Sequence, residues 1–190
     1  MTTRLNLLCS ASTSAVSSIA FPLDEPLDMR GRESLSRLAR RLPSCDIVLR
    51  SPALRAAQTA EGLTLDARAE PLLRDCDFGR WAGRSLAEVQ AQAPEAVADW
   101  LANPHAAPHG GESFADVMTR VGGWLAGLPA GSCVLAITHP FVIRAAIAHA
   151  LGAGPETFRH IDVAPLTRTK LSGGGGRWTL AALVSLKDER

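Results

Sequence analysis

The 190-residue sequence lacks a block of basic residues, a metal-type cysteine spacing and an apolar segment of membrane length. Twenty Lys and Arg residues stand against nineteen Asp and Glu residues, which gives a formal charge of +1. This balance leaves no basic stripe suited to a phosphate backbone, so we expect no nucleic-acid partner. Lysine is scarce, with only Lys170 and Lys187.

The cysteines are few and scattered. Cys9, Cys45, Cys76 and Cys133 form no CxxC motif and no Cys/His pair at metal-ligand spacing. The pattern therefore predicts neither a zinc site nor a disulfide framework, and we expect no metal and no cofactor. Reduced cysteines favour a cytoplasmic location.

Signals for export and membrane insertion are also missing. The first ten residues, MTTRLNLLCS, contain one Arg and only a short apolar run, without the apolar core of a signal peptide. The longest apolar stretch, residues 133–151, contains His139, Pro140, Arg144 and His149. Charged side chains are costly at bilayer depth, so this stretch predicts no membrane span.

A hydrophobic content of 46% is enough for one sizeable core, and we expect a single domain over residues 1–190. Three short apolar runs predict buried strands at residues 4–8, 46–49 and 133–137. Periodic segments predict helices over residues 32–42, 51–61, 85–101 and 113–128, with loops at 9–28 and 71–83. Residues 167–171 and 177–184 flank a glycine run and predict a hairpin. This alternation predicts a three-layer α/β/α sandwich with a mostly parallel sheet.

In the helix expected at residues 32–42, the apolar and basic residues fall on different faces. Leu35, Leu38 and Leu42 share one face, and Arg37, Arg40 and Arg41 lie largely on the other.

Polar residues follow the predicted parallel strands. Ser10, Ser51 and His139 each stand at or just beyond a strand end. Ligands bind at the carboxyl ends of such strands, and helices that open at Pro52 and Pro140 present free N–H groups that favour an anion. The residues alone therefore predict a pocket for a small anionic molecule.

Five segments, in this order, carry a family resemblance: Leu5-Asn6-Leu7-Leu8, residues 51–60 (SPALRAAQTA), residues 73–83 (LRDCDFGRWAG), Gly110-Gly111-Glu112-Ser113 and residues 134–139 (VLAITH). Together they resemble the histidine phosphatase, or phosphoglycerate mutase-like, superfamily over nearly the whole chain. The resemblance implies the phosphoglycerate mutase-like form of the sandwich.

The first strand of that family normally ends in Arg-His-Gly, where the histidine attacks phosphorus and the arginine binds phosphoryl oxygens. Here the aligned triplet is Cys9-Ser10-Ala11. By resemblance, Arg55 matches the second phosphate-binding arginine and His139 the second pocket histidine. Asp75 falls at the position of the family's proton donor.

The segment with Glu112 and Ser113 matches a family motif whose role is partly structural, and Glu112 is a candidate binding residue. Loss of a covalent nucleophile costs on the order of a millionfold in rate. Loss of one arginine costs only about ten- to a hundredfold in phosphate affinity. We therefore expect binding of a small phosphorylated or otherwise anionic metabolite through Arg55, His139, Ser10 and Cys9, without phosphohistidine hydrolysis.

Two other functions stay open. The first is an active phosphatase, hydrolase, lyase or isomerase with altered chemistry, in which His139 and Asp75 transfer protons and Ser10 acts as an alternative nucleophile. The second is a scaffold with a vestigial pocket, in which Arg55 pairs with Asp75 or Asp77 as a structural bridge. Arg120 is expected to be a surface or packing charge, and the chain to be a monomer or homodimer.

Overall fold

A computed structural model of the chain describes residues 1–36, 38 and 41–186. The strands are β1 (Thr3–Cys9), β2 (Ile47–Arg50), β3 (Arg68–Ala69), β4 (Cys133–Thr138), β5 (Thr167–Gly174) and β6 (Arg177–Ser185). They form one sheet in the order β3-β2-β4-β1-β5-β6. β1, β2, β3 and β4 run parallel, and the β5–β6 hairpin adds an antiparallel edge next to β1. The predicted strands, the hairpin and the mostly parallel sheet are confirmed.

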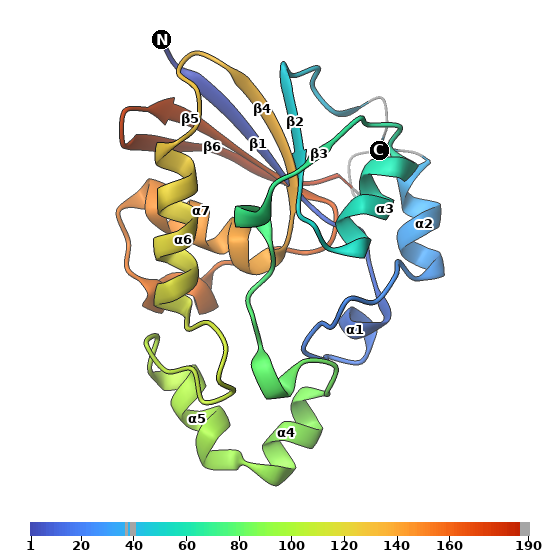
Figure 1. Ribbon diagram of the computed structural model, residues 1–190, viewed down its shortest axis with the longest axis vertical. Helices are drawn as coiled ribbons and strands as arrows, with labels where there is room; N and C mark the ends of the chain where they lie inside the picture. The colour runs from blue at the N-terminus through green and yellow to red at the C-terminus, as the bar shows by residue number, and fades with distance from the viewer. Residues whose placement is uncertain (37, 39–40, 187–190) are drawn as a thin grey trace.

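The helices are α1 (Ser14–Ser17), α2 (Met29–Leu35), α3 (Leu54–Gly62), α4 (Leu86–Gln92), α5 (Pro94–Ala102), α6 (Phe114–Ala126) and α7 (Pro140–Leu151). Figure 1 shows α6 and α7 on one face of the sheet and α2 and α3 on the other. α4 and α5 extend beyond the sheet. The three-layer sandwich is thus confirmed. Within the described residues, no helix is both long and apolar enough to cross a bilayer.

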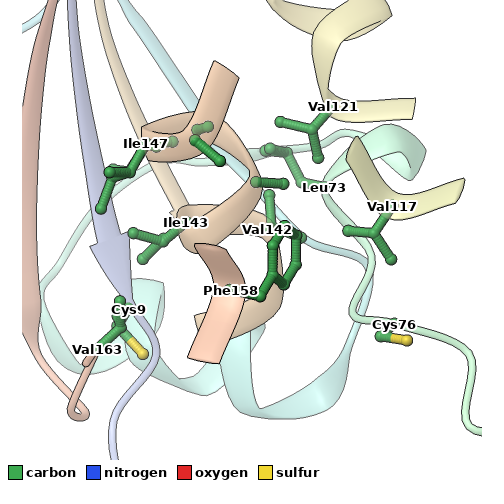
Figure 2. Packing of buried hydrophobic residues seen from close by; sticks show 14 of the residues in the cluster. Cys9, Leu73, Cys76, Val117, Val121, Val142, Ile143, Ile147, Phe158 and Val163 are labelled. Carbon is green, nitrogen blue, oxygen red and sulfur yellow. The ribbon is translucent and has the colours of Figure 1, made fainter. Parts of the chain in front are cut away.

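The strand sequences explain the two layers of core. β1 and β4 are buried on both faces, so both read as continuous apolar runs. Leu5 and Leu7 pack with α6 and α7, whereas Leu8 and Ile137 pack with α2 and α3. Figure 2 shows side chains of α6 and α7 in the first of these clusters, to which Cys9 at the end of β1 also belongs. The two layers hold the end of β1 at a fixed place in the sheet.

The helix predicted over residues 85–101 is instead two helices, α4 and α5. Ala93 joins them in a non-helical conformation, with φ −147° and ψ 64°. The physical reason is Pro94, because a proline disfavours helical geometry at the residue before it and suits the first position of a helix. Ser85 caps α4 through a reciprocal pair of hydrogen bonds with Glu88.

Three other boundaries differ from prediction. α3 begins at Leu54 rather than at residues 51 or 52, and its N-cap residue is Ala53, whose N–H donates to Ser51 Oγ at 3.2 Å. α1 forms inside the predicted loop at residues 9–28. α2 ends at Leu35, and residues 37, 39 and 40 of the helix predicted over 32–42, with Arg37 and Arg40 among them, lie outside the described residues.

A disulfide corrects the cysteine prediction. Cys45, just before β2, is joined to Cys133 at the start of β4. The two residues are 88 positions apart in sequence, so no local cysteine spacing indicates the pair. Cys9 and Cys76 are free and buried.

Aromatic side chains fill the space between the sheet and the α4–α5 extension. Trp81 contacts Phe21 and Trp100 at ring-centroid distances of 5.1 and 5.7 Å. His109 is only 2% exposed, and its ring lies 5.0 Å from that of Trp81. Burial lowers the pKa of His109. This cluster supports the loop that carries Asp75.

Candidate ligand pocket

A pocket of about 240 Å³ lies at the carboxyl end of β1. Its lining residues are Cys9, Ser10, Ala11, Thr13, Ala15, Val16, Ala20, Pro22, Glu25, Arg55, Asp75, Pro140, Phe141, Arg144, Val163 and Pro165. This location agrees with the expectation that ligands bind at the carboxyl ends of parallel strands. Of the predicted site residues, Cys9, Ser10, Arg55 and Asp75 line it directly.

The backbone at the end of β1 is held on both sides. The Ser10 N–H donates to the Thr138 carbonyl at 2.8 Å, continuing the pairing with β4. The Ala11 N–H donates to Thr59 Oγ1 at 3.0 Å, and the same hydroxyl donates to the Arg55 carbonyl at 2.7 Å. Ser10 is therefore placed by main-chain contacts alone, since its hydroxyl makes no hydrogen bond within the described residues.

Cys9 is 1% exposed and lies opposite Thr138 in the β1–β4 pairing. Burial raises the pKa of the Cys9 thiol to about 12, and the nearby Asp75 carboxylate acts in the same direction. At neutral pH the side chain is a thiol rather than a thiolate, which makes it a weak nucleophile. Figure 2 shows it beside Val163.

Arg55, in the first turn of α3, is the most connected side chain of the pocket. Its NH2 group donates to Asp75 Oδ2 at 2.7 Å and its NH1 group to the Leu23 carbonyl at 2.9 Å. Its Nε–H donates to His139 Nδ1 at 3.1 Å. Glu25 Oε1 lies 4.0 Å from NH1. The guanidinium side chain is only 7% exposed, so these bonds are shielded from water.

His139 lies below this layer and is fully buried. It is the N-cap residue of α7, with Pro140 at the first helical position as predicted. Since Arg55 donates to Nδ1, Nε2 carries the ring proton and donates to Ser51 Oγ at 2.7 Å. Burial lowers the pKa of His139 to about 4, against the opposing effect of Asp75. At neutral pH the ring is neutral and both nitrogens are occupied.

Asp75 follows the 3-10 turn at Pro71–Leu73. Oδ1 accepts from the Cys76 N–H at 2.9 Å, while Oδ2 accepts from Arg55 and lies 3.7 Å from His139 Nδ1. The structure therefore brings Arg55, Asp75 and His139 into one network at the base of the pocket. The pairing of Arg55 with Asp75, considered above as a bridge, is present.

Glu112 does not line the pocket. Arg120 binds its two carboxylate oxygens at 2.8 and 2.9 Å, and Arg74 binds Oε1 at 2.8 Å. Arg120 also donates to the Leu72 carbonyl within the 3-10 turn and to the carbonyls of Arg74 and Asp75 after it. Glu112 is thus occupied in a structural ion-pair cluster, and Arg120, predicted to be a surface or packing charge, is a buried part of it. Ser113 caps α6 with Asp116.

Two charged lining residues had no role in the sequence prediction. Glu25, in the segment before α2, accepts hydrogen bonds from the Thr13 hydroxyl and the Leu23 N–H. Arg144, on α7, donates Nε–H to the Ile161 carbonyl at 2.8 Å, and its guanidinium lies 5.5 Å from the centre of the Phe141 ring. The one available signal was the position of Arg144 one helical turn after Pro140, facing the strand end.

Among the described residues, no group of three or more His, Cys, Asp and Glu side chains is arranged to hold a metal ion. The polar groups at the base of the pocket are instead bonded to one another.

Comparison with known families agrees with this architecture. The model of the histidine phosphatase superfamily (branch 1) matches residues 13–185. The chain belongs to this superfamily. The match begins after Cys9-Ser10-Ala11, the triplet at the end of β1. Within the histidine phosphatase match lie Arg55, Asp75 and His139.

The relatives include phosphatases. The bifunctional protein Rv2228c of Mycobacterium tuberculosis is 34% identical over 138 residues, which cover 67% of this chain and 38% of the relative. Glucosyl-3-phosphoglycerate phosphatase of Mycolicibacterium vanbaalenii is 37% identical over 107 residues, or 52% of this chain and 46% of the enzyme. The chain thus spans less than half the length of these curated relatives.

A solved complex shows the same fold. Mycobacterial glucosyl-3-phosphoglycerate phosphatase bound to inorganic phosphate aligns with a TM-score of 0.79 and 27% identity, over 98% of this chain and 99% of the other. The phosphoglycerate mutase-like form of the sandwich, expected from the motifs, is confirmed.

Proposed function

We propose that this histidine phosphatase-fold protein binds a small anionic metabolite, phosphorylated or otherwise, and does not catalyse phosphohistidine-dependent hydrolysis. One observation carries the proposal. Ser10 stands at the end of β1, next to the β4 end that carries His139, where the family resemblance expects the attacking histidine. An alcohol there has no unprotonated nitrogen with which to attack phosphorus.

The surrounding network does not supply Ser10 with a base. A serine nucleophile needs a proton acceptor within hydrogen-bond reach. His139 has a side chain of a suitable type, but Arg55 donates to its Nδ1 and Ser51 accepts from its Nε2. The Asp75 carboxylate is held by Arg55 and by the Cys76 N–H. These bonds favour a binding protein over the altered enzyme considered from the sequence.

Features that attract an anion remain in the pocket. Arg55 and Arg144 both line it, and the amino end of α7 opens on it at Pro140 and Phe141. Helix amino ends and arginine side chains both stabilise negative charge. The bound phosphate of the related glucosyl-3-phosphoglycerate phosphatase supports the same choice of ligand class.

The decisive test restores the missing triplet. The wild-type protein and the variant Cys9→Arg/Ser10→His/Ala11→Gly are assayed with a panel of phosphomonoesters, and acid-labile phosphate on histidine is measured after brief incubation. We expect no pocket-dependent turnover in the wild type. The restored variant is expected to gain phosphohistidine, because the backbone at this strand end is already fixed by β4 and Thr59.

Two control variants make the assay interpretable. Ser10→Ala tests whether any wild-type turnover depends on the hydroxyl, and Ser10→His alone tests the histidine without its arginine. Robust wild-type turnover that is absent from a folded Arg55→Ala variant would refute the binding-protein proposal. A cytoplasmic location and a monomeric or homodimeric state stay predictions.

A further inference from the structure

The pocket has no excess of positive charge. Two of its charged lining residues are cations, Arg55 and Arg144, and two are carboxylates, Glu25 and Asp75. Cys9 and His139 add no charge at neutral pH, because burial raises the pKa of the first and lowers that of the second. The lining therefore carries two positive and two negative charges. A dianion entering this space meets a net charge of zero, which is a poor environment for its second negative charge.

Arg55 also has limited bonding capacity left. A guanidinium has five N–H groups, and His139, Leu23 and Asp75 take three of them. One N–H remains on each terminal nitrogen. Two donors can bind two oxygens of a carboxylate or of a phosphate, so the choice between these anions depends on the charge of the pocket.

Most of the pocket wall is apolar. The apolar lining residues are Ala11, Ala15, Val16, Ala20, Pro22, Pro140, Phe141, Val163 and Pro165. They come from four separate segments: the turn after β1, the α1 region, the start of α7 and the loop before β5. A ligand that fills this space buries apolar surface, and each buried methylene is worth about fourfold in affinity.

We propose that the preferred ligand is a small monocarboxylate attached to an apolar group, held by Arg55 and packed against the wall formed by Val16, Phe141 and Val163. This inference rests on the proposed function and narrows its ligand class. An apolar acid satisfies the two free donors of Arg55, adds one negative charge rather than two, and fills the apolar volume.

The test uses four probes in titration calorimetry at pH 7.5: acetate, phenylacetate, inorganic phosphate and phenyl phosphate. We expect phenylacetate to bind about tenfold or more tightly than acetate, because its ring is buried. Phenylacetate is also expected to bind more tightly than phenyl phosphate, which is largely dianionic at this pH. Lowering the pH to 5.5 converts phenyl phosphate largely to its monoanion, and its affinity is expected to rise about tenfold. Phenylacetate stays ionised over this range and serves as the control.

Two variants separate packing from charge. Val16→Ser is expected to weaken the binding of phenylacetate about two- to fourfold and to leave the binding of acetate unchanged. The matched control is Ile19→Ser, since Ile19 lies three residues away, is 71% exposed and does not line the pocket. Glu25→Gln removes one negative charge and is expected to raise the affinity for phenyl phosphate relative to the affinity for phenylacetate.

The outcomes distinguish the two proposals. Tighter binding of either phosphate than of phenylacetate at pH 7.5 would overturn the carboxylate inference and leave the anion-binding function standing. Equal binding of acetate and phenylacetate would also overturn the inference. If none of the four probes binds at millimolar concentration, the proposed function itself fails.

Discussion

The ends of β1 and β4 lie side by side in the sheet and are built in opposite ways. At the end of β4, His139 is fully buried and both ring nitrogens are bonded, to Arg55 and to Ser51. At the end of β1, Ser10 lines the pocket, and its hydroxyl has no hydrogen-bond partner among the described residues. One strand end is a bonded structural network, and the other is held through its main chain alone. The difference teaches that Arg55 and His139 hold each other in place through side-chain bonds, while the adjacent strand end depends on main-chain bonds.

The strongest test of the β4 side removes its central cation. Arg55→Ala leaves Asp75 without its 2.7 Å ion pair and His139 Nδ1 without a donor, both in a buried setting. Breaking a buried pair by deleting one partner costs about 3–5 kcal/mol. Urea unfolding is expected to show a loss of this size. Arg74→Ala is the control, because Arg74 is 47% exposed and its pair with Glu112 is expected to contribute less than about 1 kcal/mol. Equal losses for both variants would contradict the network.

The pH dependence of stability tests the buried imidazole. The folded pKa of His139 is about 4 and the usual value is 6.5, so between these values the unfolded chain binds a proton that the folded chain does not. Stability is therefore full above pH 6.5 and falls as the pH drops toward 4, by about 3 kcal/mol from this group.

The measurement is the free energy of unfolding between pH 7.5 and 4 for the wild type and His139→Gln. The variant is expected to show a shallower pH slope. His105→Gln serves as the control, because His105 is an exposed loop residue. An unchanged slope in His139→Gln would place the titrating group elsewhere.

Two serine variants compare the strand ends directly. Ser51→Ala removes the acceptor of the His139 Nε2–H in a fully buried place and is expected to cost about 1–3 kcal/mol. Ser10→Ala removes a hydroxyl that has no partner within the described residues, and its expected cost is within about 0.5 kcal/mol. Thermal and urea unfolding measure both. A larger loss for Ser10→Ala than for Ser51→Ala would reverse the comparison.

The smallest expected effect concerns Cys9. Burial and a pKa raised to about 12 keep its thiol protonated and out of reach, so a disulfide reagent is expected to label neither Cys9 nor Cys76 in the folded protein. In urea, both thiols should react. Rapid labelling of Cys9 in the native state would show that the end of β1 is open to solvent.

Much of the fold follows from sequence periodicity. β1 and β4 are buried on both faces, and such strands leave a plain apolar signature. The start of α7 follows from the chemistry of Pro140 at the first helical position. The break at Ala93 was missed because the apolar spacing continues across it, although Pro94 carried the signal.

The site was predictable to a lesser degree. Arg55, Asp75 and His139 were found through motif order, and the structure joins them. Glu112 and Arg120 pair with each other outside the pocket. The sequence alone does not show whether Glu112 binds a ligand or an arginine of the same chain. Glu25 lies in a segment without periodicity, so its place in the pocket had no sequence signal. The Cys45–Cys133 disulfide depends on the β2–β4 pairing, which brings distant residues together.

Thr59 has a consequence for how this family can change. Its hydroxyl links the Ala11 main chain to α3 and thereby fixes the path of the chain just after β1. Since this link uses the main-chain N–H of Ala11, a substitution of the Ser10 side chain leaves the hydrogen bond in place. The course of the backbone at the mouth of the pocket is thus set by α3 and β4, and the side chain at position 10 can be varied as a probe of chemistry while the main chain stays in register.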